Sequence, residues 1–506
     1  MFVNYGFNNF IPFVMSLKAS NYNFKLLFFS IIASIIAYGF ALTNFSLSID
    51  SESPIISDFS LALGRWGTNL IRYYIFGGHL PYFTLLLSLI LLSFTAVELS
   101  KLFKLQGSLM YVFCLLFLTF PQLSYQLVFT MQADVVAIGF LLSVATVVLF
   151  IRSTENMFSI KSILLLISAS LVFMFVIASY QALLFIPIII YLIHFFQNTY
   201  LEDFNLKKEF IKLLYFGGLV IFSFGLYFIS VKLFCPAVEE GYLSSYVSGE
   251  SNNQFLDFCS LWATNLVGNF YYGEKTFMVA TLLSVVLFVR FFIEKTQVLI
   301  RFGILFILLL LPFIMSYFIT NGYHPPRIYV TSGLVYAFII VHAAGYYKRE
   351  SILIFICSFI CLANIYFINK LFYSNYQISN HDKVIAKKID ASILSQYPDF
   401  DPNVNYVYFF GCLPYEHHQN FRIDKSEVFG GSLFNWDNGS NYRIINLFKY
   451  QDIANYKMID NKEIYLRIKD SIGSMPIWPK KESVKMINNV VVVKLGNNKG
   501  SPLWVE

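Results

Sequence analysis

Residues 26–43 read LLFFSIIASIIAYGFALT, an apolar run without a single charged residue. A helix needs about 20 such residues to cross the ~30 Å hydrocarbon core of a membrane, so this stretch predicts a membrane span. The same pattern recurs along the chain, with short polar connections between the runs. Further spans are predicted at 81–98, 108–124, 134–151, 163–178, 182–196, 213–234, 277–293, 302–319, 328–345 and 351–369, about eleven in all.

The composition indicates the same class of protein. Hydrophobic residues make up 57% of the chain and charged residues 13%, about half the charged fraction of a typical soluble protein. The net charge of +6 does not indicate nucleic-acid binding, because Lys and Arg are spread over short connections. The predicted fold is therefore a polytopic α-helical membrane protein. Its first span lacks a signal-peptide cleavage site and is expected to remain as an anchor.

The distribution of basic residues predicts the orientation, because Lys and Arg are enriched in cytoplasmic connections. Alternate connections carry groups of Lys and Arg, whereas the others carry mainly acidic residues. The N-terminus is expected in the cytoplasm and, after an odd number of spans, the C-terminal segment outside. The basic set comprises Lys18, Lys25, Lys101, Lys104, Arg152, Lys161, Lys207, Lys208, Lys212, Arg290, Lys295, Arg301, Lys348 and Arg349; the acidic set comprises Asp50, Glu52, Asp58, Asp134, Glu239, Glu240, Glu250 and Asp257.

The composition changes after Lys370. Residues 371–506 are polar and mixed, with a helix-like stretch at 381–397 and strand-like runs at 405–411 and 488–495. A segment of this size can form a small domain with its own core. The chain is thus predicted to comprise a polytopic core, residues 1–370, and a small C-terminal α/β domain, residues 371–506.

Asp50 and Glu52 follow the first span closely, at the predicted outer boundary of the membrane. Carboxylates near a bilayer usually face a water-filled cavity or a pocket, because they are costly to desolvate. The pair is interpreted as a site for acid–base chemistry, and the alternative is that it only solvates the end of a helix. A metal pair holding a nucleotide diphosphate is rejected, since no G-x-G-x-x-G or βαβ pattern is present.

Other candidate residues lie in the predicted outer connections. Arg65 and Trp66 share the connection of the two carboxylates. Asp134 begins a span, where a helix N-cap is the favoured interpretation and support of substrate hydroxyls the alternative. Tyr180 and Gln181 interrupt two nearly continuous apolar runs.

Arg327 follows two prolines at the outer end of a span. It either snorkels to the interface or binds a lipid-linked phosphate through its guanidinium fork. Trp436 beside Asp437, and Trp478 between two prolines, combine aromatic and polar side chains as sugar-binding sites do. Their alternative is a place in a core or in an interfacial aromatic belt.

The six cysteines show no metal-binding spacing. Cys114, Cys357 and Cys361 lie inside apolar runs, where free thiols are common. Cys235 and Cys259 bracket one connection and could form a disulfide if that connection faces an oxidising compartment.

Several short motifs occur in order across most of the chain. They are 48-SIDSE-52, 63-LGRWG-67, 179-SYQA-182, 430-GGS-432, 435-NWDNG-439 with Arg443, and 475-MPIWP-479. In these motifs the chain resembles the serotype-converting O-antigen glucosyltransferases that temperate phages bring to enteric bacteria.

The resemblance implies a GT-C-type enzyme of the bacterial inner membrane. Such an enzyme moves glucose from undecaprenyl-phosphate glucose to a sugar of the lipid-linked O-antigen repeat on the periplasmic face, which makes the C-terminal domain periplasmic. It implies two companions, a flippase for the lipid-linked glucose and the enzyme that makes this donor. No cofactor and no metal are expected, because lipid phosphate leaves without an obligatory metal in related GT-C enzymes.

The mechanism expected from these residues is a single inverting displacement. Glu52 or Asp50 accepts the proton of the attacking hydroxyl, while Arg327 and Arg65 offset the charge of the leaving phosphate. An O-antigen polymerase is one alternative, although polymerases usually place their large outer domain between spans. A transporter or flippase is the other, although it needs polar or broken helices deep in the membrane and these runs look mostly smooth.

Overall fold

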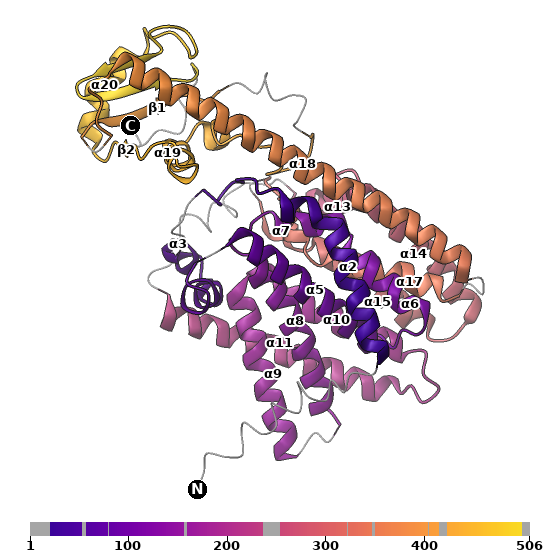
Figure 1. The fold of residues 1–506 in the computed structure, drawn as a ribbon. Coiled ribbons are helices and arrows are strands. Elements are labelled where there is room, and N and C mark those ends of the chain that lie inside the picture. The colour runs from indigo at the N-terminus through magenta and orange to yellow at the C-terminus, as the bar shows by residue number, and fades with distance from the viewer. Residues whose placement is uncertain are drawn as a thin grey trace.

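The computed structural model describes residues 21–52, 57–78, 80–155, 159–235, 253–320, 322–346, 350–402, 404–413 and 423–497. In these residues the chain forms a helical bundle, and a small α/β domain lies at one end of it (Figure 1). We call this end of the bundle the domain end. The helices of the bundle are α2 (Asn21–Thr43), α3 (Ser57–Ala62), α4 (Trp66–Asn69), η1 (Leu70–Ile75), α5 (Pro81–Leu102), α6 (Ser108–Leu118), η2 (Pro121–Leu123), α7 (Ser124–Leu127), α8 (Ala133–Ser153), α9 (Ile160–Ser179), η3 (Gln181–Leu184), α10 (Phe185–Asn198), α11 (Leu206–Phe234), α13 (Gln254–Leu266), η4 (Glu274–Thr276), α14 (Phe277–Glu294), α15 (Val298–Leu310), η5 (Leu311–Phe313), α16 (Met315–Phe318), η6 (Pro326–Tyr329) and α17 (Ser332–Ala344).

The predicted apolar runs are helical, but not all of them form full-length spans. Within the described residues eight helices are long and apolar enough to cross a membrane, or up to nine if a bent pair counts as one span. The predicted runs at 302–319 and 328–345 correspond instead to shorter apolar helices, Val298–Phe313 and Ser332–Ala344. The bundle therefore has the character of a polytopic membrane protein, with fewer unbroken spans than the eleven predicted runs.

Prolines explain two of the interruptions. Pro121 opens η2 just after α6, and the two segments meet at an angle of 42°. Pro312 lies in η5, directly after α15. Proline lacks a backbone N–H and its ring clashes with the preceding turn, so it ends or bends a helix at these points. A third break, between α9 and η3, occurs at Tyr180, whose backbone is extended.

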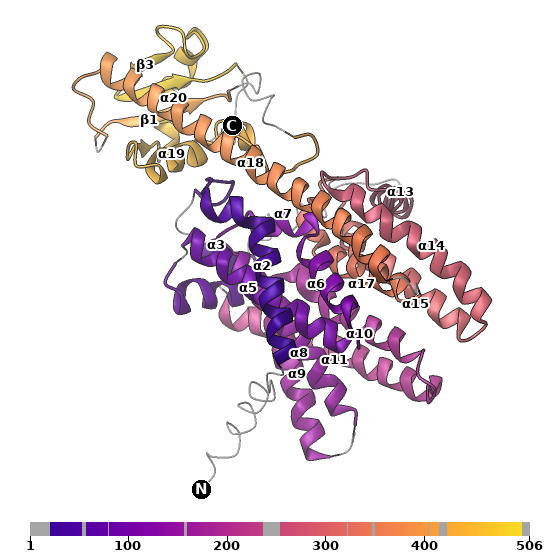
Figure 2. The same ribbon diagram turned by 45° about the vertical axis from the view of Figure 1, so that its right-hand side comes forward.

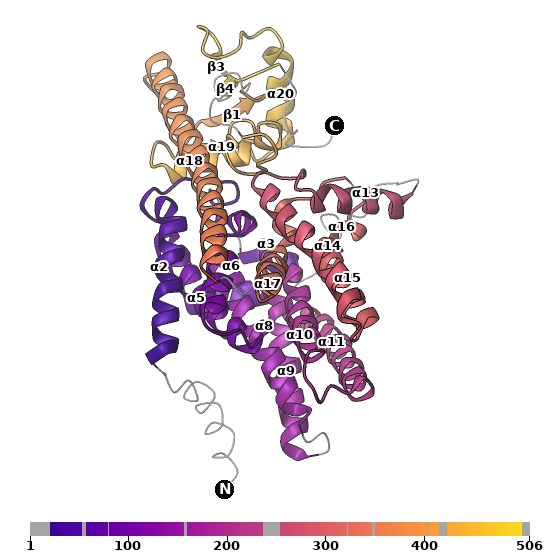
Figure 3. The ribbon, with the colours of Figure 1, turned by 90° about the vertical axis from the view of Figure 1, so that its right-hand side faces the viewer.

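Helix α18 (Glu350–Gln396) connects the bundle with the α/β domain. Its 47 residues correspond to about 70 Å of helix, far more than the ~30 Å of hydrocarbon in a membrane. Figure 2 and Figure 3 show its first half against the bundle and its second half against the domain. The helix predicted at 381–397 is thus the outer part of one continuous helix that passes through Lys370.

The α/β domain is built on a four-stranded sheet of order β2-β1-β4-β3. Strand β1 is parallel to both β2 and β4, whereas β3 and β4 are antiparallel. The run predicted as one strand at 488–495 is β4 with the turn that precedes it: Asn488 and Asn489 both have positive φ, as a two-residue hairpin turn requires. The elements are β1 (Tyr406–Phe410), η8 (Trp436–Asn438), α19 (Asn441–Tyr450), β2 (Lys457–Met458), α20 (Lys462–Ile472), β3 (Val484–Ile487) and β4 (Val490–Lys494).

Strand β4 begins with four consecutive valines, as suits a strand whose two faces are both covered. Val490 and Val492 pack with Ile468 of α20. Val491 and Val493 belong to the main hydrophobic cluster, which continues into the bundle. The small domain therefore shares its core with the helices below it.

Candidate functional site

The connection that follows α2 lies beneath the α/β domain and is fixed by α18. The Ser379 hydroxyl accepts a hydrogen bond from the Leu47 backbone N–H at 3.0 Å, and the Asn375 side chain donates to the Ser46 hydroxyl at 2.8 Å. The Phe45 ring stacks on Tyr450 of α19 with ring centroids 6.0 Å apart. Together these contacts place the following residues, Asp50 and Glu52, against the domain.

Arg443 of α19 binds the two predicted carboxylates. Its Nη1 atom donates to Glu52 Oε1 at 2.5 Å and to Asp50 Oδ1 at 3.1 Å. Its Nε atom donates to Asp437 Oδ2 at 2.5 Å. A single guanidinium thus joins two carboxylates from the bundle with one from the domain. Burial lowers the pKa of Arg443, but these three negative partners outweigh burial, so the pKa of Arg443 is raised.

The two predicted carboxylates differ in their surroundings. The Asp50 side chain is 45% exposed, whereas that of Glu52 is 1% exposed. Burial raises the pKa of Glu52 above its ordinary value of 4.5, against the opposing effect of Arg443. Glu52 Oε2 has no hydrogen-bond partner among the described residues. Glu52 therefore presents one bound oxygen and one buried, unpaired oxygen, as a general base needs.

Arg327 forms a second ion pair close to the first cluster. Its guanidinium binds Glu427 of the domain, which also accepts a hydrogen bond from the Tyr323 hydroxyl at 3.3 Å. Burial raises the pKa of Glu427, Arg327 opposes this effect, and the negative charge of Asp50 adds to it. Residues 128 and 129 contact Ser48 on one side and Arg327 on the other, so the two ion-pair groups lie near each other.

Helix α7 and the segment after it connect these groups from below. The Gln126 side chain donates to the Arg327 carbonyl, and the Val128 carbonyl accepts from the Ser48 hydroxyl at 3.1 Å. The Arg327 guanidinium lies 5.3 Å from the centre of the Phe129 ring. The break after α6, which turns the chain at Pro121, is therefore what brings this segment under the carboxylates.

Several buried polar atoms here have no hydrogen-bond partner among the described residues. Buried polar groups are normally paired, so such atoms mark a place where a polar ligand can supply hydroxyl or N–H groups. Besides Glu52 Oε2 they are Glu427 Oε2, Gln122 Oε1, Gln126 Oε1, Thr130 Oγ1 and His324 Nδ1.

The 430-GGS-432 motif has a structural role on α18. Buried Asp382 accepts hydrogen bonds from the Ser432 hydroxyl and from the Leu433 backbone N–H, both at 2.8 Å. These bonds hold the segment that leads to Trp436 and Asp437. Asp437 contacts Arg443, while the Trp436 ring packs against the core.

Arg65, Tyr180 and Gln181, three of the sequence candidates, contact one another in a second group. Arg65 Nε donates to the Gln181 carbonyl oxygen at 2.9 Å, and its guanidinium lies 4.8 Å from the centre of the Tyr180 ring. Gln181 also donates to the Leu63 carbonyl at 2.7 Å. Trp66 donates from its indole N–H to Ser230 of α11 at 2.9 Å. The group fastens α4 to α9 and α11.

Asp134 lies in the first turn of α8, two residues after the N-cap residue Gln132. It is fully buried and forms an ion pair with Arg72, which also donates to the Met131 carbonyl at 2.9 Å. The N-cap interpretation is therefore off by two residues. The pair instead ties η1 to the start of α8.

Trp478 lies beside the end of β4, where its backbone N–H donates to the Lys494 carbonyl at 2.8 Å.

The six cysteines, Cys235 and Cys259 included, are free thiols. No group of three or more His, Cys, Asp or Glu side chains in the described residues is arranged to hold a metal ion.

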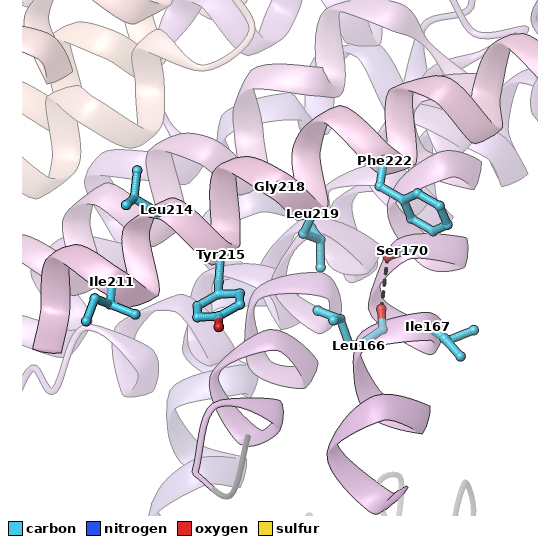
Figure 4. Close-up of a pocket in the computed structure, with 9 residues that line it drawn as sticks. All are labelled: Leu166, Ile167, Ser170, Ile211, Leu214, Tyr215, Gly218, Leu219 and Phe222. Carbon is cyan, nitrogen blue, oxygen red and sulfur yellow. Dashed lines mark hydrogen bonds between the residues drawn. The ribbon is translucent and has the colours of Figure 1, made fainter. Parts of the chain in front are cut away.

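Two large grooves lie away from the charged site, on the sides of the bundle. One, of about 500 Å³, runs between α9 and α11 and is lined by Leu, Ile, Phe and similar side chains (Figure 4). The other, of about 570 Å³, lies between α2, α6 and α18. Their linings suit hydrocarbon rather than a sugar or a phosphate, so they are not the chemical site.

Three residues of the site were not among the sequence candidates: Arg443, Glu427 and Tyr323. Arg443 was visible as part of a motif, but its partners were not. No local sequence pattern marks Glu427 or Tyr323, because Glu427 becomes significant through its ion pair with Arg327 and Tyr323 through its hydrogen bond to Glu427.

The fold and the site define a polytopic helical protein with a buried, base-like carboxylate between its bundle and a small α/β domain. A family model described as Glucosyl transferase GtrII matches residues 39–342. The chain belongs to this glucosyl transferase family, and membership supports transferase activity. No curated protein and no solved structure matches the chain.

Proposed function

We propose that the chain is an inverting glucosyltransferase that moves glucose from undecaprenyl-phosphate glucose to a sugar of the O-antigen repeat on the periplasmic face of the inner membrane. The observation that carries the proposal is Glu52, a buried carboxylate with one unpaired oxygen beneath the α/β domain. The family match supports the transfer of glucose. The donor, the acceptor and the serotype conversion that follows come from the resemblance of the motifs.

In the proposed reaction Glu52 Oε2 accepts the proton of the acceptor hydroxyl as its oxygen attacks the anomeric carbon of glucose. The bond between that carbon and the phosphate oxygen breaks, and the lipid phosphate leaves with its electron pair. Arg327, and Arg65 from the second group, are the proposed cations for the phosphate charge. Because Arg327 is paired with Glu427, phosphate binding would have to compete for its guanidinium.

Asp50 is the less suitable base. Its half-exposed carboxylate stays solvated, so water competes with the acceptor hydroxyl for hydrogen bonds to it. We assign it, with Asp437, to contacts with sugar hydroxyls. Trp436 and Trp478 are proposed platforms for sugar rings, and Tyr180, Gln181 and Asp134 supporting residues that hold the bundle around the donor.

We also propose an orientation in the membrane and a division into two domains. The N-terminus is cytoplasmic, residues 1–370 form the membrane core, and residues 371–506 form a periplasmic domain. A flippase and a donor-synthesising enzyme supply the lipid-linked glucose. These companions are needed for function and do not have to bind the chain.

A lipid-linked sugar transporter or flippase is the second candidate. Helix breaks of the kind that transporters use occur after α6, α9 and α15, so the spans are less smooth than the sequence suggested. The transferase is favoured because it gives the unpaired carboxylate oxygen of Glu52, at the domain end of the bundle, a proton to accept. A polymerase remains the alternative with the same periplasmic chemistry.

The test is the mass and linkage of the O-antigen repeat from a host that supplies donor and flippase. We expect one added hexose per repeat with the wild-type chain and none with Glu52→Gln at equal membrane levels. Asp50→Asn should reduce the modified fraction, and Glu463→Gln, whose side chain is 75% exposed, should match wild type. An unmodified repeat with every variant, wild type included, would exclude the glucosyltransferase. Full modification by Glu52→Gln would exclude Glu52 as the base.

A further inference from the structure

We infer that Arg443, a residue of the α/β domain, is the positioning residue of the transferase: it fixes one oxygen of Glu52 and directs the other toward the acceptor hydroxyl. The inference rests on the proposed function, and it extends the catalytic site beyond residues 39–342, the part of the chain that the family model matches.

The hydrogen bonds of Arg443 fix the orientation of the Glu52 carboxylate. Arg443 Nη1 binds Glu52 Oε1 at 2.5 Å, and Oε2 has no partner among the described residues. Arg443 is itself fixed, since its Nε atom binds Asp437 at 2.5 Å. A carboxylate that is held through one oxygen cannot rotate freely, so its other oxygen keeps one direction. Such fixed orientation is what general-base catalysis requires.

The charged groups around Glu52 determine how readily it is ionised. Glu52 is almost fully buried, and burial alone favours a neutral carboxylic acid, which cannot accept a proton. The charged groups around it are Asp50 on its own loop, Asp437 and Arg443 from the domain, and beyond Asp50 the Arg327–Glu427 pair. Among the described residues Arg443 is the cation in direct contact with Glu52, so its charge opposes the rise in the pKa of Glu52 that burial causes.

The helix that carries Arg443 is held on two sides. It lies on α19, whose Asn441 exchanges two hydrogen bonds of 2.7 Å with the Phe409 backbone of β1. On the bundle side, Tyr450 of the same helix stacks on Phe45. The domain therefore places Arg443 rigidly over Glu52, and domain and bundle form one site.

The experiment measures the protonation of Glu52 directly, without requiring activity. Membranes that contain the full chain are treated with N,N′-dicyclohexylcarbodiimide, which modifies protonated carboxyl groups, between pH 5 and pH 9. Modification of the peptide with Glu52 is then quantified by mass spectrometry. For Arg443→Ala and Arg443→Gln we expect the midpoint of modification to move upward by about one to three pH units. Arg443→Lys, which keeps the charge, should move it less.

Arg467→Ala is the matched control, because this arginine of the same domain has a side chain that is 68% exposed. Its midpoint should equal that of wild type. Should Arg443→Ala fail to accumulate, Arg443→Gln and Arg443→Lys carry the comparison. An unchanged midpoint in the folded Arg443 variants would overturn the inference.

Glucose transfer in the same membranes separates the inference from the proposed function. If both hold, Arg443→Gln loses transfer at pH 7 and recovers part of it at higher pH, as a purely structural variant would not. A shifted midpoint with no transfer by the wild-type chain would reject the proposed function and keep the role of Arg443 in holding Glu52. Transfer by wild type with an unshifted midpoint in Arg443→Gln would reject only the inference.

Discussion

At the scale of single residues, burial separates two carboxylates that look alike in the sequence. Asp50 and Glu52 lie two positions apart and share Arg443. The backbone of Asp50 adopts a positive φ of 70°, which turns the chain so that its carboxylate remains in solvent while that of Glu52 is buried. A buried carboxylate is the better base, because its raised pKa increases its affinity for a proton.

The pH dependence of transfer follows from the raised pKa of Glu52. A base works only when it is deprotonated, so activity is lost as the pH falls through the pKa of the folded protein. Because burial raises that pKa above 4.5, the acid limb of wild-type activity should have its midpoint above pH 4.5. The measurement is the initial rate of glucose transfer in membrane vesicles between pH 4.5 and pH 8. Glu463→Gln should keep this limb unchanged, and a wild-type midpoint at or below 4.5 would contradict the assignment.

At the scale of elements, α18 aligns the parts of the site. Asn375, Ser379 and Asp382 are spaced by four and three residues and therefore lie on one face of the helix. The first two hold the connection after α2, and the third holds the segment before η8. One face of α18 thus sets the distance between the two carboxylates and the residues of the α/β domain that bind them.

The short helix α4 depends on close approach to α9. A Cβ atom on Gly67 would lie 2.9 Å from the Ser179 backbone nitrogen. Gly67→Ala should therefore push α4 away from α9 and disturb the Arg65 group, at a cost of about 1–3 kcal/mol in stability. Thermal unfolding of the purified protein in detergent measures the effect.

Gly225→Ala in α11 is the control for Gly67→Ala. A Cβ atom there meets no atom within 4 Å, and alanine favours a helix interior by up to about 1 kcal/mol relative to glycine. Its unfolding temperature should equal or exceed that of wild type. Equal unfolding temperatures for Gly67→Ala and wild type would show that α4 can move away without cost.

At the scale of the whole molecule, the site exists only where the domain meets the bundle. The main hydrophobic cluster runs from the bundle into the domain through residues such as Phe372, Phe429 and Phe434. Phe372 and Phe429 make an edge-to-face contact with ring centroids 5.1 Å apart. The shared core makes it costly for the domain to lift away from Glu52.

The proposed orientation predicts which surfaces an impermeant reagent reaches. A cysteine at Asp470, exposed on α20, should react with a membrane-impermeant maleimide in intact spheroplasts. One at Glu202, exposed between α10 and α11, should react only after permeabilisation. Peptide mass spectrometry locates the label, because the chain has native cysteines. The opposite pattern would place the domain in the cytoplasm and exclude a periplasmic site.

The sequence alone determined the class of protein and a C-terminal segment with strands, and it named the two carboxylates as candidates. These follow from hydropathy and side-chain chemistry, which are local properties. It overestimated the number of unbroken spans, because Pro121 and Pro312 shorten helices within apolar runs. Only the tertiary structure decided which carboxylate is buried and what binds it. Arg443 lies 391 positions from Glu52, and no local pattern connects two residues that meet only when the domain packs on the bundle.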